Sequence, residues 1–203
     1  MFRETVTHAG GDSQGTASES HALMLLRRAL NRGYGMEATL TGGASIRWTR
    51  VDVTTHSIVL RSVALAPELP ADALDDATRA RLALIGLGDA QYVVHADRRV
   101  ITAGGTEIEP FDTARLRARR LVAVDRNNRV RLTLAARLSL LALDHVQAGG
   151  GTDGFAMCSC GYTANGPTGE AVDEVLRNHR QTVTARFVEG IDATYAAAVS
   201  ESR

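Results

Sequence analysis

Residues 111–146 carry the most specific pattern in the chain, and they read FDTARLRARR LVAVDRNNRV RLTLAARLSL LALDHV. Asp112 or Thr113 is suited to cap a short helix, because either side chain can accept a backbone N–H at a helix start. Asn127 and Asn128 tolerate positive φ and therefore favour a tight turn. The elements expected in order are a helix (112–120), a strand (121–125), a turn (126–128), a strand (129–132) and a long apolar helix (133–146).

The same stretch holds a concentration of positive charge. Residues 111–147 contain eight arginines against three acidic residues, a net charge of +5, whereas the whole chain balances 23 basic against 23 acidic residues. Every basic residue is arginine, and the absence of lysine is typical of GC-rich genomes such as those of actinobacteria and their phages. A local excess of guanidinium groups in a neutral chain indicates an anionic partner for that segment.

The predicted helix 112–120 can be divided into faces at 100° per residue. Ala114, Ala118 and Leu121 fall together and are expected to face the core, while Leu116 points away from them. The arginines occupy the remaining faces, which is the division that a helix lying in a DNA major groove requires.

The order helix, strand, turn, strand, helix resembles the end of a bacterial winged helix-turn-helix domain. The residues that carry the resemblance are Arg120-Leu121-Val122 after the first helix and Arg131-Leu132-Thr133 before the second. The resemblance implies a recognition helix, a β-hairpin wing and a homodimer on paired half-sites. It extends back to a helix starting near Asp75, but two strands between 92 and 102 stand where the family has its second helix.

On this resemblance we expect a duplex DNA-binding protein, a regulator of a bacterium, phage or plasmid, and not an enzyme. The arginines expected to contact DNA are Arg115, Arg117, Arg119 and Arg120 on the helix and Arg126, Arg129 and Arg131 on the wing. Two alternatives remain open. The arginines can form an ordinary solvated face, with Asp112 pairing locally with Arg115, or the chain can be a non-enzymatic protein-interaction module of a mobile genetic element.

A second motif lies near the C-terminus. Cys158-Ser159-Cys160-Gly161 resembles the entry of a zinc knuckle, and His179 falls on the inward face of a predicted helix (168–182). Two thiolates from a turn and an imidazole from a helix are ligands that zinc accepts, so we predict a zinc site at Cys158, Cys160 and His179. The fourth ligand is left open among His145, Asp173 and Glu174, and the thiols can equally be inert buried groups or redox-active ones.

The turn-forming and helix-capping residues in the rest of the chain predict an α+β fold. We expect two helix-plus-β-hairpin units, the second winged-helix-like, followed by a small Cys-containing helical module. Glycine and proline clusters mark the boundaries. The expected segments are a disordered tail (1–19), a helix with a Gly42-Gly43 hairpin and a third strand (20–70), the winged-helix-like unit (71–147), a glycine-rich linker (148–154) and the Cys/His module with a further short helix (155–203).

Several classes of protein are excluded or disfavoured. No apolar run approaches the roughly 18–20 residues of a membrane span, and residues 1–18 lack the apolar centre of a signal peptide. A chain without lysine cannot contain a Walker-type phosphate loop. Two cysteines are too few for a disulfide framework, so a reducing cytoplasmic location is expected.

Overall fold

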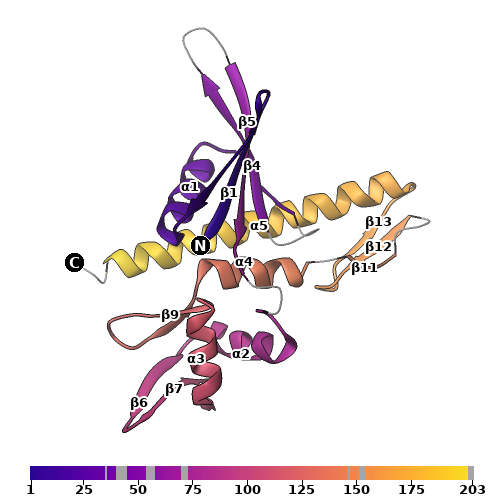
Figure 1. The fold of residues 1–203 in the computed structure, drawn as a ribbon. Coiled ribbons are helices and arrows are strands. Elements are labelled where there is room, and N and C mark those ends of the chain that lie inside the picture. The colour runs from indigo at the N-terminus through magenta and orange to yellow at the C-terminus, as the bar shows by residue number, and fades with distance from the viewer. Residues whose placement is uncertain are drawn as a thin grey trace. The chain divides into compact units, whose positions relative to one another are not determined.

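The computed structural model describes residues 1–34, 36–39, 45–53, 58–69, 73–145, 147–150 and 154–200. Helices and small antiparallel sheets alternate along the chain, which is the expected α+β class (Figure 1). The chain divides into two compact units. One consists of 1–66 together with 141–203, and the other of 67–140. Within the described residues, no helix has the length and hydropathy needed to cross a membrane.

The N-terminal segment is ordered, so the expectation of a disordered tail is wrong. It forms a hairpin, β1 (Phe2–His8) and β2 (Gly11–Ala17), in which every residue of β1 has a partner in β2. The polar composition of β2 suggested disorder, but an edge strand needs only its backbone to pair, and Phe2 and Ala17 anchor its open end in the core. The sheet has the order β2-β1-β5-β4-β3, with β3 (Met36–Thr39), β4 (Ser45–Val53) and β5 (Ile58–Pro67).

The helix that follows the first hairpin, α1 (Glu19–Asn31), begins with a side-chain cap. The hydroxyl oxygen of Ser18 accepts a hydrogen bond from the amide of His21 at 3.2 Å, as an N-cap does. The helix buries Ala22 and Leu26. The strands β4 and β5 pair from Ile46↔Leu65 to Val53↔Ile58. The predicted Gly42-Gly43 turn lies outside the described residues.

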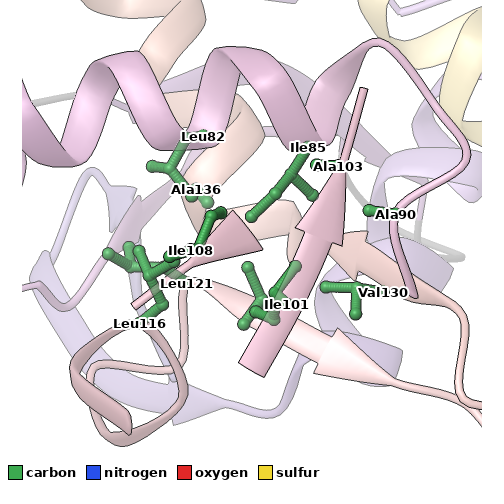
Figure 2. Packing of buried hydrophobic residues seen from close by; sticks show 11 residues of the cluster. Leu82, Ile85, Ala90, Ile101, Ala103, Ile108, Leu116, Leu121, Val130 and Ala136 are labelled. Atoms are coloured by element: carbon green, nitrogen blue, oxygen red, sulfur yellow. The ribbon is translucent and has the colours of Figure 1, made fainter. Parts of the chain in front are cut away.

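The unit 67–140 begins with a helix that has a complete N-cap and then alternates strands with short helices. Its elements are α2 (Asp76–Gly86), β6 (Gln91–His95), β7 (Arg98–Ala103), β8 (Thr106–Ile108), α3 (Pro110–Ala118), β9 (Val122–Val124), β10 (Val130–Leu132) and most of α4 (Leu134–Leu143). One apolar cluster joins them, and Figure 2 shows Leu82, Ile101 and Leu116 meeting in it. The expected strands between 92 and 102 are therefore present and belong to a three-stranded sheet, β6-β7-β8.

The orientation of α3 differs from the sequence prediction. Leu116 and Thr113 are buried, whereas Ala114 and Ala118 are exposed and Phe111 is 77% exposed. The prediction placed the helix start at 112 and chose the face with the most apolar residues. The helix instead begins at Pro110 and packs against β7, where the Thr113 hydroxyl accepts a hydrogen bond from the amide of Ile101.

The hairpin β9–β10 forms as predicted. Its register is Val130↔Val124 to Leu132↔Val122, and Asn128 takes the positive φ of +59° that the turn requires. The carboxylate of Asp125 accepts hydrogen bonds from the amides of Asn127 and Arg129 at 2.8 and 2.9 Å. A β-bridge from Gln91 to Arg129 connects this hairpin with β6.

The C-terminal segment is a three-stranded sheet followed by one long helix. The strands are β11 (Gln147–Gly150), β12 (Phe155–Cys158) and β13 (Thr163–Asn165), and the helix is α5 (Gly169–Ser200). The expected linker 148–154 is thus partly a strand, because glycines pair by their backbone as well as other residues do. The two helices expected after residue 168 are continuous, since no proline interrupts them.

Candidate metal centre

Four residues with metal-binding side chains meet beside the sheet β11-β12-β13. Their ligand atoms all lie within 4.8 Å of one another. His145 follows the end of α4, Cys158 is the last residue of β12, Cys160 lies in the turn after it, and His179 stands on α5. Elements that are distant in the sequence therefore supply one site, since His145 and His179 are 34 residues apart.

The turn between β12 and β13 sets the position of the two thiols. The amide of Gly161 donates to the carbonyl of Cys158 at 2.9 Å, and the amide of Cys158 donates to the carbonyl of Tyr162 at 2.8 Å. Gly161 has a φ of +89°, a conformation that side-chain-bearing residues rarely adopt. The tight turn brings the Cys160 side chain back toward the one of Cys158.

The second half of the site depends on helical spacing in α5. Val172 and Leu176 are buried against Ala156, Cys158 and Ala164 of the sheet. His179 follows Leu176 by three residues and so lies on the same face of the helix. The inward orientation that the sequence predicts for His179 is confirmed.

The distances fit a four-coordinate ion. The two imidazole nitrogens, Nδ1 of His145 and Nε2 of His179, are 3.3 Å apart. Cys158 Sγ is 3.6 Å from His145 Nδ1, and Cys160 Sγ is 3.3 Å from His179 Nε2. A tetrahedral zinc ion with ordinary bond lengths separates two nitrogen ligands by about 3.4 Å and a nitrogen from a sulfur by about 3.6 Å. These three of the six ligand–ligand separations are within about 0.3 Å of those values, and the other three are no longer than 4.8 Å.

Burial favours the uncharged form of three of the four groups. Desolvation raises the pKa of the Cys158 thiol and lowers the pKa of both His145 and His179. For His179 the neighbouring His145 lowers the pKa further. Neutral imidazoles are the form that binds metal. A cation between the sulfur atoms would remove the disadvantage of thiolates in this environment, because it supplies the missing opposite charge.

The ring of Tyr162 covers one side of the site. It stacks on the ring of His179 with the two centroids 4.0 Å apart and the planes 1° from parallel. This contact fixes the plane of the imidazole and with it the direction of Nε2. Cys160 is exposed, so the site is accessible from solvent at that corner.

The structure brings together Cys158, Cys160 and His179, the three ligands that the sequence predicts. Of the three residues left open for the fourth position, His145 joins them, while Asp173 and Glu174 are exposed on α5 and outside the cluster. Their place on the outer face of the helix follows from spacing: neither is three or four residues from His179.

The arginines of the basic segment are placed less uniformly than expected. Arg115 Nη2 lies 2.6 Å from the carboxylate of Asp75, and Arg131 Nη2 lies 3.6 Å from that of Asp125. The local pair expected between Asp112 and Arg115 is not formed, because Asp112 binds Arg81 at 2.5 Å. Two of the seven proposed DNA contacts are therefore partly neutralised by carboxylates.

Of the other five arginines proposed to contact DNA, all but the half-buried Arg119 are exposed. Arg117 donates to the Tyr92 hydroxyl at 2.6 Å and lies over its ring, 4.8 Å from the centroid. Arg119 is the C-cap of α3, and Arg120 follows it with a positive φ of +55°. Arg126 and Arg129 are exposed in and beside the β9–β10 turn.

Comparison of the chain with known protein families, with curated proteins and with solved structures gives no match.

Proposed function

We propose that this protein binds one zinc ion through His145, Cys158, Cys160 and His179, and that the ion is structural. The observation that carries the proposal is the meeting of four ligand atoms within 4.8 Å. Two sulfur and two nitrogen donors suit zinc better than magnesium or calcium, which prefer oxygen. Four protein ligands leave no coordination position for a substrate or water, which is the arrangement of structural zinc.

The role of the ion follows from the elements that it would join. The apolar cluster of the C-terminal sheet is small, with five buried residues in the described part of the chain, and two of them are alanines. Such a cluster contributes little free energy by itself. A bound ion would cross-link the end of α4, the β12–β13 turn and α5, and its binding energy would become folding energy for this module.

The test is metal analysis of the full chain purified without chelator, together with cobalt substitution. We expect about one zinc per chain, and after exchange with Co²⁺ the visible bands of a tetrahedral S₂N₂ site. Cys160→Ser and His145→Ala should each lower the metal content strongly. Asp173→Ala with Glu174→Ala is the matched control, because both carboxylates lie on α5 outside the cluster, and it should retain the metal. A zinc content near zero in the wild-type chain overturns the proposal.

A second candidate function is duplex DNA binding by the unit 67–140, in the manner of a winged helix. The observation that favours it is the β9–β10 hairpin directly after α3, with exposed guanidinium groups at Arg117, Arg120, Arg126 and Arg129. Here α3 packs against β7, whereas the recognition helix of a winged-helix domain packs against a second helix. Three to five phosphate contacts correspond to a log–log salt slope of about −3 to −5.

Fluorescence anisotropy of a labelled duplex at two salt concentrations tests this candidate. We expect Arg126→Ala with Arg129→Ala to weaken binding and to flatten the salt slope by about 2, one for each lost phosphate contact. Arg98→Ala is the control, since Arg98 in the same unit is already paired with Glu107 and Glu109. Wild-type binding that is absent at low salt, or unchanged in the double variant, removes this candidate.

A further inference from the structure

A cleft between α1 and the N-terminal sheet is separate from the residues of the metal centre. It is lined by Arg28 in the last turn of α1, by Arg32 and Tyr34 just beyond the helix, and by Trp48 and Arg50 from β4. In Figure 1, α1 lies alongside β1 and β4, which is where the cleft is found. Its free volume is about 30 Å³, space for roughly two water-sized atoms.

The strand β4 explains the mixed lining of the cleft. Its side chains alternate, so Ile46, Trp48 and Arg50 point to the side covered by α1, and Arg47 points to the opposite, exposed side. Ile46 and Trp48 are buried under the helix. Arg50 comes next on the same face, where the apolar floor ends.

Positive charge exceeds negative charge in this cleft. Three guanidinium groups line it, and the only carboxylate in the lining is that of Glu4. Glu4 lies 3.9 Å from His21. Among the described residues neither Arg28 nor Arg32 has a carboxylate within 4.0 Å, although the charge of Asp52 acts on Arg32 from a greater distance. A position near the C-terminus of α1 favours a cation through the helix dipole, but the dipole does not saturate the donors of two guanidinium groups.

The hydrogen bonding of the cleft is incomplete. Arg50 Nη2 donates to Asp52 at 2.7 Å, yet its Nε is buried and has no acceptor among the described residues. Arg32 reaches the Tyr34 hydroxyl only at 3.5 Å, and that hydroxyl reaches the carbonyl of Val51 only at 3.5 Å. Contacts of this length are weak. The Tyr34 hydroxyl and the Arg32 guanidinium, which make only these weak contacts within the described part of the chain, can therefore turn to an acceptor from outside the chain.

We propose that this cleft binds the phosphate group of a phosphate ester, with Arg28, Arg32 and Arg50 as its charged donors and Tyr34 as a neutral one. Guanidinium groups bind phosphate oxygens through pairs of parallel N–H bonds, and three of them match the several acceptors of a phosphate better than those of a carboxylate. The small volume admits one or two phosphate oxygens, and the phosphorus and the rest of the ligand remain at the mouth of the cleft. The ester is either a small molecule or the backbone of a nucleic acid.

The fluorescence of Trp48 provides the test, because it is the one tryptophan of the chain and lines the cleft. The full-length protein is titrated with inorganic phosphate, with glycerol 2-phosphate and with a short DNA duplex. We expect a saturable change with phosphate at a Kd on the order of 1 mM. If the duplex saturates the same signal at a far lower concentration of phosphate groups than inorganic phosphate does, the site is assigned to nucleic acid. If the duplex binds equally or more weakly per phosphate group, the site is assigned to small esters.

Charge variants decide whether the cleft is the binding site. Arg28→Gln with Arg32→Gln should weaken phosphate binding at least about tenfold, and Glu4→Gln should strengthen it, since it removes the opposing charge. Arg47→Gln on the other face of β4 should leave the Kd unchanged. Circular dichroism checks that each variant is folded. If the Arg28→Gln, Arg32→Gln variant does not fold, the change in Kd of Glu4→Gln alone tests the proposal. No saturable signal, an unchanged Kd in the arginine variant and in Glu4→Gln, or an equal loss in Arg47→Gln overturns the proposal.

Discussion

Thr113 connects α3 to two strands through a single hydroxyl group. Its Oγ1 accepts a hydrogen bond from the amide of Ile101 at 3.1 Å and donates one to the carbonyl of Ile108 at 3.0 Å. The side chain is 1% exposed, so water cannot replace either bond. We expect Thr113→Val to lower the free energy of unfolding by about 1–3 kcal/mol, because valine fills the space but leaves two buried backbone groups unpaired. Urea denaturation measures this difference.

The control for this variant is Thr106→Val on the neighbouring strand. Thr106 is exposed in β8, and a β-branched replacement there should change stability by less than about 0.5 kcal/mol. Equal effects of the two substitutions would show that the buried hydroxyl of Thr113 contributes nothing specific.

Asp75 combines a helix cap with an ion pair. Its carboxylate accepts from the amide of Thr78 at 2.7 Å and binds Arg115 at 2.6 Å. The backbone and side-chain hydrogen bonds of Thr78, followed by that of Arg115, lower the pKa of Asp75 to about 2. A carboxyl group with a lowered pKa in the folded state stabilises the fold above its unfolded pKa of about 3.9, and this contribution is lost as the pH falls toward 2.

The expected result is a difference in pH dependence between two proteins. Between pH 5 and pH 2 the melting temperature of the wild type should fall more steeply than that of Asp75→Asn, in which the cap is retained and the titrating group is gone. Circular dichroism melts at several pH values measure both slopes. Parallel slopes would mean that Asp75 has the same pKa in the folded and unfolded states.

At the scale of elements, the β12–β13 turn controls the geometry of the metal centre. Gly161 has a φ of +89°, so Gly161→Ala places a side chain in a strained conformation. We expect this variant to bind zinc at least about tenfold more weakly, since disturbing the groups that orient metal ligands commonly costs about 10–100-fold in metal affinity. Competition with a chromophoric chelator measures the affinity. Gly169→Ala, at the start of α5 where an added Cβ meets nothing within 4 Å, should bind zinc as the wild type does.

At the scale of the whole molecule, the unit 67–140 has its own apolar cluster and is continuous in sequence. We therefore expect a fragment of residues 67–143, which completes α4, to fold on its own and to unfold cooperatively. Ile101 is fully buried in this cluster, so Ile101→Ala should destabilise the fragment by about 2–5 kcal/mol. Calorimetry and the dispersion of amide NMR signals test this. A fragment without a cooperative transition would show that the unit depends on the rest of the chain.

Much of the local structure could be predicted because it depends on neighbouring residues. Asp75 marks the start of α2, Asn128 takes positive φ in the β9–β10 turn, and Thr133 precedes α4, and each of these features is a property of a short segment. The prediction of structure failed where contacts between residues distant in the sequence determine it. Residues 2–17 look disordered by composition, yet they form two strands because the sheet supplies backbone partners. The buried face of α3 was likewise chosen wrongly, because β7 selects Leu116 and Thr113.

The amino-acid sequence by itself predicted the start of α2, the β9–β10 turn and three of the four proposed metal ligands, Cys158, Cys160 and His179. Caps, turn residues and spacing of this kind act within one short segment. Only the tertiary structure decided that His145, and neither Asp173 nor Glu174, completes the set. The physical reason is that a metal site requires ligand atoms a few ångströms apart in space. The return of the chain from α4 to α5 sets that distance, and no local pattern of residues encodes it.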